Sequence, residues 1–166
     1  GRSYLERVRA AAQRMGHLID DILELSRVSR HAMRQERVDL SRLAAELMDE
    51  IRDGDLLRSV EVSIAPDCTA LGDPRLLRVL LQNLLENAWK YSARQTEARI
   101  DFGSERLDTG DTAFFVRDNG VGFDMKYAGR LFSPFQRLHS PEEYPGSGIG
   151  LATVARIVHR HGGRVW

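Results

Sequence analysis

The sequence predicts an α+β fold: a two-layer α/β sandwich with strands on one side and helices on the other, preceded by a protruding helix. Three observations lead to this prediction. Apolar residues recur at helical spacing in several long stretches. Three shorter runs have the alternation or the apolar content of strands. The chain has 166 residues, 42% of them hydrophobic, which suffices for one ordinary globular core.

The stretch from Tyr4 to Arg30 contains neither a proline nor a pair of glycines and predicts one long helix. Its apolar residues alternate in spacing between three and four, which is typical of a helix packed along a bundle seam. These residues are Leu5, Val8, Ala12, Met15, Ile19 and Ile22. One such helix has no core of its own, so we expect it to pack against a partner helix across a dimer interface.

Two further helices have recognisable beginnings. Asp39 is a good N-cap for a helix over residues 40–51. Asp73 caps a longer helix with Pro74 in its first turn, where proline is tolerated, and this helix runs to about Ser92.

Strands are expected at three places. Residues 60–65 (VEVSIA) alternate apolar and polar side chains and predict a half-buried strand. Residues 98–103 and 113–118 are two further strand-like runs, joined by the turn signal 108-DTGD-111.

The last quarter of the chain begins irregularly. Residues 125–144 carry prolines and predict a loop region. A final helix is predicted from Ile149 to His161, ended by two glycines. Residues 164-RVW-166 then have the composition of a strand cut short.

Composition excludes several classes of function. The formal net charge is zero, so nothing favours bulk binding to nucleic acid or to anionic membranes. No apolar run approaches the roughly 18 residues of a membrane span, and no signal-peptide pattern opens the chain. Cys68 is the single cysteine, which excludes an internal disulfide. We therefore expect a cytoplasmic protein, although a fragment of a membrane-anchored parent would look the same.

The helix that begins at Asp73 carries a polar cluster beside its predicted buried stripe. At about 100° per residue, the stripe consists of Leu77, Leu81, Leu84 and Ala88. The cluster on its flank consists of Asn83, Asn87 and Lys90. An amide oxygen is a neutral ligand for Mg²⁺, and a neighbouring lysine can neutralise phosphate charge. Taken alone, these residues are explained as well by the polar surface of a helix.

A first glycine cluster follows a strand. In 118-DNGVGFD-124 an aspartate ends an apolar run, where its carboxylate can accept a hydrogen bond from an exocyclic amino group such as that of adenine. The two glycines let a ligand approach the backbone closely. By itself this stretch is better explained as an ordinary turn.

A second glycine cluster leads into the last helix. The backbone N–H groups of 146-GSGIGLAT-153 form an anion site at a helix N-terminus. No Gly-Lys-Ser/Thr follows and no strand precedes it, which excludes a Walker loop and a dinucleotide fingerprint. The three motifs together supply a metal ligand, an adenine acceptor and a phosphate cradle, and they favour nucleotide binding.

With these residues the chain resembles the bacterial sensor histidine kinases of two-component signalling, in particular the phytochrome-like and PAS-linked ones. Their ATP-binding domain is shared with gyrase, Hsp90 and MutL proteins. Four ordered motifs carry the resemblance: the N box in 83-NLLENAWKYS-92, the G1 box in 118-DNGVGFD-124, the F box in 132-FSPFQRLH-139 and the G2 box in 146-GSGIGLAT-153. The resemblance implies a Bergerat-type ATP-binding domain over residues 35–166, truncated before its last strand. Residues 1–34 would be the second helix of a dimerisation hairpin and its linker.

The resemblance also implies a site for ATP and Mg²⁺, with residues 125–144 as the ATP lid. Asn87 would coordinate Mg²⁺, and Asp118 would receive the adenine amino group. The implied catalytic residues are Asn83, Lys90 and Arg137. The other implied nucleotide contacts are Tyr91, Gly120, Gly122, Gly146, Ser147, Gly148, Ile149, Gly150 and Leu151.

The phosphoacceptor motif of the family is missing. The histidines are His17, His31, His139, His159 and His161, and each is explained more simply by a structural role. We therefore expect phosphotransfer to a histidine on an absent helix of the same or a partner protomer. The receiver domain of a response regulator would then take the phosphoryl group, and the parent protein would be a homodimer.

Two alternatives remain. One is a gyrase- or Hsp90-type ATPase, but those relatives normally place a glutamate base where Asn83 stands. The other is a degenerate kinase that serves as a non-catalytic interaction module, against which the complete set of motifs argues.

Overall fold

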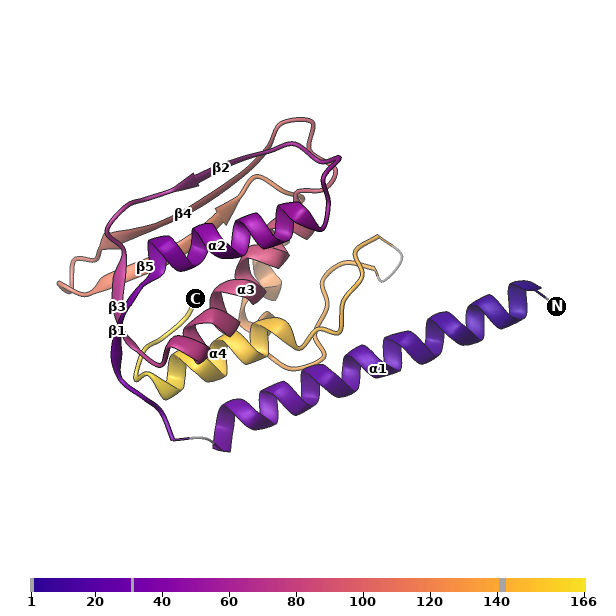
Figure 1. The fold of residues 1–166 in the computed structure, drawn as a ribbon, viewed down its shortest axis with the longest axis horizontal. Helices are drawn as coiled ribbons and strands as arrows, with labels where there is room; N and C mark the ends of the chain where they lie inside the picture. Colours follow the sequence, from indigo (N-terminus) through magenta and orange to yellow (C-terminus); the bar gives the residue numbers. More distant parts are fainter. Residues whose placement is uncertain (1, 31, 141–142) are drawn as a thin grey trace. The chain divides into compact units, whose positions relative to one another are not determined.

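The computed structural model describes residues 2–30, 32–140 and 143–166 (Figure 1). The chain forms two compact units. One comprises residues 33–125, and the other comprises residues 1–32 together with residues 126–166. The predicted domain boundary between residues 34 and 35 stays a prediction.

A three-stranded sheet forms one layer of the unit 33–125, and two helices form the other (Figure 1). The strands lie in the order β2 (Val60–Ile64), β4 (Ala98–Arg106), β5 (Thr112–Asp118). β2 runs parallel to β4, and β4 runs antiparallel to β5. The helices are α2 (Leu40–Asp53) and α3 (Pro74–Tyr91). This arrangement confirms the predicted α+β sandwich.

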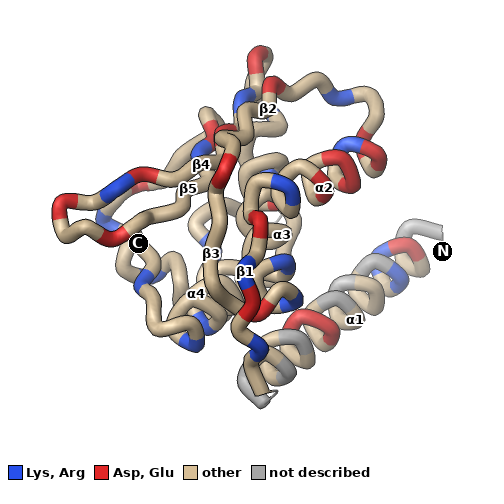
Figure 2. Tube along the Cα trace, turned by 60° about the vertical axis from the view of Figure 1, so that its left-hand side comes forward, with Lys and Arg blue, Asp and Glu red and all other residues tan. Residues whose placement is uncertain are grey.

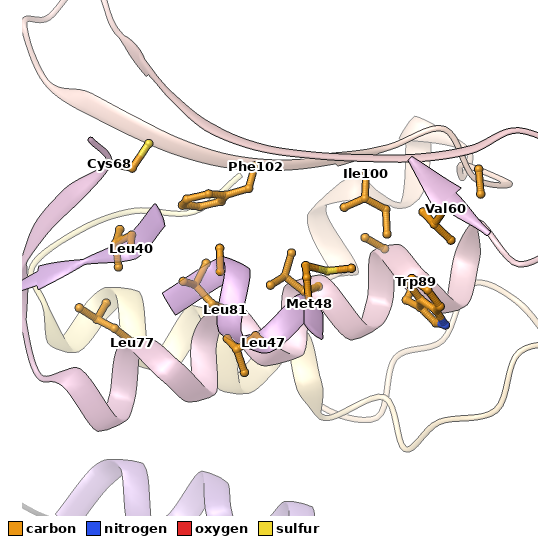
Figure 3. Close-up of a cluster of buried hydrophobic side chains, with 14 residues drawn as sticks. Leu40, Leu47, Met48, Val60, Cys68, Leu77, Leu81, Trp89, Ile100 and Phe102 are labelled. Carbon is orange, nitrogen blue, oxygen red and sulfur yellow. The ribbon is translucent and has the colours of Figure 1, made fainter. Parts of the chain in front are cut away.

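The hydrophobic core lies between these two layers, where apolar side chains of both helices meet those of β2 and β4 (Figure 3). The buried residues of α3 are Leu77, Leu81, Leu85, Ala88 and Trp89. The predicted stripe was therefore wrong at one position, because Leu85 is fully buried and Leu84 is only half-buried. The sheet meets α3 further round the helix than apolar spacing alone indicated.

A second, two-stranded sheet was not predicted. It pairs β1 (Glu36–Asp39) antiparallel with β3 (Thr69–Gly72). Both strands have four residues, and most of their side chains are exposed. Neither has the alternation or the β-branched content that marks a strand in a sequence. Their pairing joins segments about 30 residues apart, which local patterns do not reveal.

Both predicted N-caps are confirmed, since the side chains of Asp39 and Asp73 accept hydrogen bonds from the first turns of α2 and α3. Asp73 accepts the N–H groups of Arg75 at 3.0 Å and of Leu76 at 3.3 Å. Its other oxygen accepts the N–H of Arg34 at 3.0 Å, and the side chain is only 1% exposed. One buried carboxylate therefore ties the segment before β1 to the beginning of α3.

These contacts hold the pKa of Asp73 at about 2, below its ordinary value of 3.8. Burial by itself would raise this pKa, but the hydrogen bonds from Arg34, Arg75 and Leu76 stabilise the carboxylate and outweigh that effect. Because the folded-state pKa is the lower one, the ionised group stabilises the fold at neutral pH by about 2 kcal/mol. That contribution is lost as the pH falls from about 4 through about 2.

The other unit contains α1 (Arg2–Arg30), α4 (Gly150–Arg160) and all but the first residue of the 3₁₀ helix η1 (Met125–Arg130). α1 contacts α4, where the Arg160 guanidinium donates to the backbone carbonyl of Val28. Both helices were predicted, and their ends agree with the expected ones within two residues.

Two expectations about this unit have different outcomes. The apolar seam of α1 is exposed, from 68% at Leu5 to 45% at Ile22, which fits a face that needs a partner. The predicted strand at residues 164–166 is wrong, because a strand requires a ladder of backbone partners and residues 163–166 form none with the described residues.

Acidic and basic residues are mixed along α2 and the β4–β5 hairpin of the unit 33–125 (Figure 2). The formal net charge of zero is that of the whole chain, and acidic residues outnumber basic ones within residues 33–125. Across the described ranges, no helix has the length and apolar content needed to cross a membrane.

Replacement of Asp73 by asparagine should destabilise the protein by about 1–2 kcal/mol near neutral pH, because an amide places only one acceptor oxygen among the converging N–H groups. The difference from the unmodified protein should shrink as the pH approaches about 3, where the aspartate of the unfolded chain becomes protonated. Urea unfolding at the two pH values measures both effects. Asp39→Asn, at the exposed cap of α2, is the matched control and should cost less. A loss at Asp73 that is independent of pH would contradict the assignment.

Candidate nucleotide-binding site

The predicted polar cluster lies on the face of α3 that points away from the sheet. At about 100° per residue, Asn83, Asn87 and Lys90 fall roughly opposite the core-facing residues of the helix. All three are half-buried. Gln82 and Glu86 of the same helix are exposed. The prediction that the cluster lies at the rim of the core and not in open solvent therefore agrees with its half-burial, although the cluster lies further round the helix from the buried stripe than predicted.

The two asparagines of this face differ in their hydrogen bonds. Asn83 donates its side-chain amide to the backbone carbonyl of Val79, one turn earlier, at 2.8 Å. The side chain of Asn87 forms no hydrogen bond with any described residue. Neither amide oxygen accepts a hydrogen bond from a described residue, and Asn87 differs in that its amide nitrogen is not engaged either.

One or two amide oxygens suffice as protein ligands of Mg²⁺ only when phosphate oxygens and water supply the other ligands. Mg²⁺ keeps several waters and often takes one or two protein ligands together with substrate phosphates. Within the part of the chain that the structure describes, no three histidine, cysteine, aspartate or glutamate side chains cluster as a metal site. The residues therefore fit a magnesium ion that arrives with a nucleotide and do not fit a resident metal centre.

The last turn of α3 presents two further predicted contacts. The Lys90 ammonium lies 4.4 Å from the centroid of the Tyr91 ring, within the range of a cation–π contact. Both side chains are half-buried. Lys90 follows Asn87 by three residues, so the two side chains are neighbours on one face of α3.

The loop after β5 packs directly against this last turn. The N–H of Val121 donates to the Tyr91 carbonyl at 3.1 Å. A Cβ at Gly120 would lie 2.5 Å from that carbonyl oxygen and 2.6 Å from Asp118 Oδ1. Only glycine fits this approach, so the polar cluster at the end of α3 and the first glycine cluster are joined by one backbone contact.

The same loop fixes one oxygen of Asp118 and leaves the other open. The N–H of Gly120 donates to Asp118 Oδ1 at 2.8 Å. Oδ2 has no hydrogen-bond partner among the described residues, and the side chain is exposed. Gly122 has φ of 63° with no atom crowding its missing side chain, so its backbone conformation and not close packing requires glycine. An acceptor oxygen is therefore held at a defined place at the end of β5.

Sequence reasoning missed Asn119, which anchors this loop to the beginning of β4. Its side chain accepts the N–H of Arg99 at 2.8 Å and donates to the carbonyl of Glu97 at 2.8 Å. Asparagine commonly bridges backbone groups near turns, and its place between an aspartate and a glycine was the available signal.

The second glycine cluster lies in the other unit. Gly146 and Gly148 have φ of 155° and 76°, and a Cβ at Gly148 would lie 2.9 Å from the carbonyl oxygen of Gln136. Gly150 opens α4, and the N-cap Ile149 provides no side-chain hydrogen bond to the first turn. Ser147 Oγ accepts the N–H of Ile149 at 3.3 Å. The first N–H groups of α4, including that of Leu151, thus have no side-chain cap at Ile149.

The predicted lid contains a contact that sequence reasoning did not foresee. Arg137 donates from its guanidinium to the carbonyl of Tyr144 at 2.5 Å, which joins the two arms of the segment. The ring of His139 lies 5.3 Å from that of Tyr144, so this histidine packs within the same segment. His161 Nδ1 lies 2.8 Å from a carbonyl at the end of α4. His31 and the side chain of His17 lie outside the described residues.

Comparison with known families identifies this architecture. Residues 72–166 match the family described as histidine kinase-, DNA gyrase B-, and HSP90-like ATPase, over more than half of the chain. The chain belongs to this family. The predicted recognition is therefore confirmed.

Curated relatives of the chain include histidine kinases and phytochromes. The methanogenesis regulatory histidine kinase FilI of Methanothrix harundinacea is 35% identical over 98% of this chain. Cyanobacterial phytochrome A of Nostoc sp. is 34% identical over 92% of this chain. The chain spans 18% and 20% of these two proteins, about a fifth of their length.

Solved structures of histidine kinases resemble this chain. The mycobacterial sensor histidine kinase MprB is 28% identical, with a TM-score of 0.63, over 76% of this chain and 82% of that one. Full-length ShkA in complex with AMPPNP is 25% identical, with a TM-score of 0.70, over 97% of this chain and 34% of that one. The chain has the histidine kinase ATP-binding domain fold.

Replacement of Gly120 by alanine should destabilise the protein by about 1–3 kcal/mol, because the added methyl group must displace the Tyr91 carbonyl. Thermal unfolding followed by circular dichroism should show a drop of several degrees, at about 2–4 °C per kcal/mol. Gly129→Ala is the control, since nothing lies within 4 Å of a Cβ there. Equal midpoints for the two variants would show that the close approach at Gly120 is not real.

Proposed function

We propose that this chain binds Mg-ATP as the catalytic part of a sensor histidine kinase. It transfers the γ-phosphate to a histidine outside these 166 residues, and a response-regulator receiver domain then takes the phosphoryl group. The observation that carries the proposal is the junction at the end of α3. There Gly120 lies against the Tyr91 carbonyl, while Asp118 keeps one oxygen open beside it.

The open oxygen of Asp118 gives the site its base selectivity. Because the N–H of Gly120 holds Oδ1, Oδ2 is oriented as an acceptor for the exocyclic amino group of adenine. A guanine base presents a carbonyl oxygen at that position and would face the carboxylate without a proton to share. Gly122, with its positive φ of 63°, lets the backbone turn next to the proposed adenine position.

The polar face of α3 serves the phosphates. Asn87 supplies one neutral oxygen to Mg²⁺, with the other ligands coming from phosphate and water. Lys90 and Tyr91 follow within one turn, where the ammonium offsets phosphate charge and the phenol lies near phosphate or ribose. When bound, Mg²⁺ neutralises charge on the phosphates, and most catalysis of phosphoryl transfer is positioning and charge neutralisation of this kind.

The glycine-rich segment provides the remaining phosphate contacts. Gly146 and Gly148 present backbone N–H groups without side chains, and Gly150 opens α4, whose N-terminal dipole favours an anion. Arg137 is a candidate for the γ-phosphate, and in that role it would exchange the Tyr144 carbonyl for a phosphate oxygen. The AMPPNP complex of the related ShkA supports a nucleotide as the ligand.

The exposed seam of α1 supports a helical partner. We propose that residues 1–34 are the second helix and linker of a dimerisation hairpin, and that this seam packs against helices of the same kind. The acceptor histidine would then lie on a neighbouring helix, on the same or the partner protomer.

The structure favours a kinase over a gyrase- or Hsp90-type ATPase. Those relatives normally carry a glutamate base at the position of Asn83. An amide is not a base, and here it donates to the carbonyl of Val79. Steady release of inorganic phosphate from ATP by this chain would favour the ATPase instead.

Calorimetric titration with AMPPNP, with and without Mg²⁺, tests the proposal. The intact chain should bind in a magnesium-dependent way, and Asn87→Ala should weaken that binding by about tenfold or more. Gln82→Ala is the matched control, because Gln82 is an exposed amide of the same helix that pairs with Glu86 at 2.8 Å. This variant should bind like the intact chain.

Two results would contradict the proposal. Absence of binding by the intact chain would favour the non-catalytic interaction module. Equal, magnesium-independent binding by all three proteins would place the metal and the nucleotide elsewhere.

A further inference from the structure

The side chain of Arg58, in the loop between α2 and β2, contacts the last turn of α3. Arg58 donates from its guanidinium to the carbonyl of Trp89 and, at 2.9 Å, to Ser92 Oγ. The guanidinium carbon also lies 4.6 Å from the centroid of the Trp89 ring. Ser92 is fully buried, and Arg58 is half-buried. Three contacts of one residue therefore converge on the C-terminal end of one helix.

This end of α3 is where such contacts matter. The last carbonyls of a helix have no partner within the helix, and the macrodipole favours a positive charge there. The planar guanidinium donates two hydrogen bonds in a fixed fork, so it orients the turn as well as stabilising it. Asp55 completes the arrangement by accepting the indole N–H of Trp89 at 3.3 Å. The turn is thus held by Arg58 at the Trp89 carbonyl and the Ser92 hydroxyl, and by Asp55 at the Trp89 indole.

The residues held in this way adjoin the candidate site. Lys90 and Tyr91 follow Trp89 directly in the sequence. The Tyr91 carbonyl accepts the N–H of Val121 and lies so close to Gly120 that no side chain fits there. A displacement of the last turn would move both the lysine and the loop that orients Asp118. Every residue in this chain of contacts belongs to the unit 33–125.

We propose that Arg58 is a positioning residue of the nucleotide site. It acts through Trp89 and Ser92, fixes the last turn of α3, and so keeps Lys90 and the Tyr91–Gly120 contact in the geometry that the nucleotide requires. This inference rests on the proposed function.

The test compares three variants of this chain by titration with Mg-AMPPNP, at a temperature where circular dichroism shows each to be folded. Arg58→Ala should weaken binding by about tenfold, the effect of losing charged hydrogen bonds that hold a binding element. Arg58→Lys keeps the charge but not the fork, and it should recover part of the affinity. Arg78→Ala is the matched control. Arg78 is another arginine, on α3, and its guanidinium donates to the Glu50 carboxylate at 2.6 and 2.8 Å. The Arg78→Ala variant should bind Mg-AMPPNP like the intact chain.

Trp89 provides a second readout. Trp166 is the other tryptophan, so in a Trp166→Phe background the fluorescence reports Trp89 alone. Arg58→Ala should increase acrylamide quenching of Trp89, because the guanidinium no longer covers the ring. Increased quenching together with weaker binding is the expected result.

Three outcomes separate the possibilities. Increased quenching with unchanged affinity would overturn the inference and leave Arg58 a packing role. Equal losses of affinity in Arg58→Ala and Arg78→Ala would also overturn it, because they would indicate general destabilisation. Absence of binding by the intact chain would instead refute the proposed function on which the inference rests.

Discussion

The packing of α3 against the sheet is the constraint on which the other features depend. Leu85 of α3 and Ile100 of β4 are fully buried in the shared core. Because consecutive residues of a helix are about 100° apart, fixing one face fixes the direction of every other side chain. The core therefore determines that Asn87 and Lys90 point away from the sheet. A helix rotated by a single residue would carry the polar face to a different place.

α3 is also fixed at both ends by groups remote in sequence. At its beginning, the carboxylate of Asp73 joins the first turn to Arg34. At its end, the Tyr91 carbonyl meets Val121 and Gly120. The glycine-rich segment before α4 combines positive φ angles at Gly146 and Gly148 with a close approach of Gly148 to the Gln136 carbonyl.

How far the sequence predicts this structure depends on how local each determinant is. The two aspartate N-caps, the glycines of the loop after β5 and the helix boundaries all follow from neighbours within a few residues, and they were predictable. The rotation of α3 was wrong by one buried position because Leu84 and Leu85 are equally apolar, and only the sheet decides between them. β1, β3 and Arg58 depend on contacts between distant segments, and no local pattern indicates them. Asn119 had a local signal, its place between an aspartate and a glycine, but its partners Glu97 and Arg99 lie about 20 residues away.

The parallel pairing of β2 with β4 has a consequence for how the protein folds. β4 and β5 are joined by a short hairpin, whereas the register of Val60 with Ala98 closes a segment that contains β3 and all of α3. Closing so long a segment costs chain entropy before any strand contact repays it, so a parallel pair of this kind forms late. α3 lies within this connection, and a helix that forms early shortens the chain to be closed. We therefore expect formation of the helix that bears the N box and completion of the sheet to be coupled.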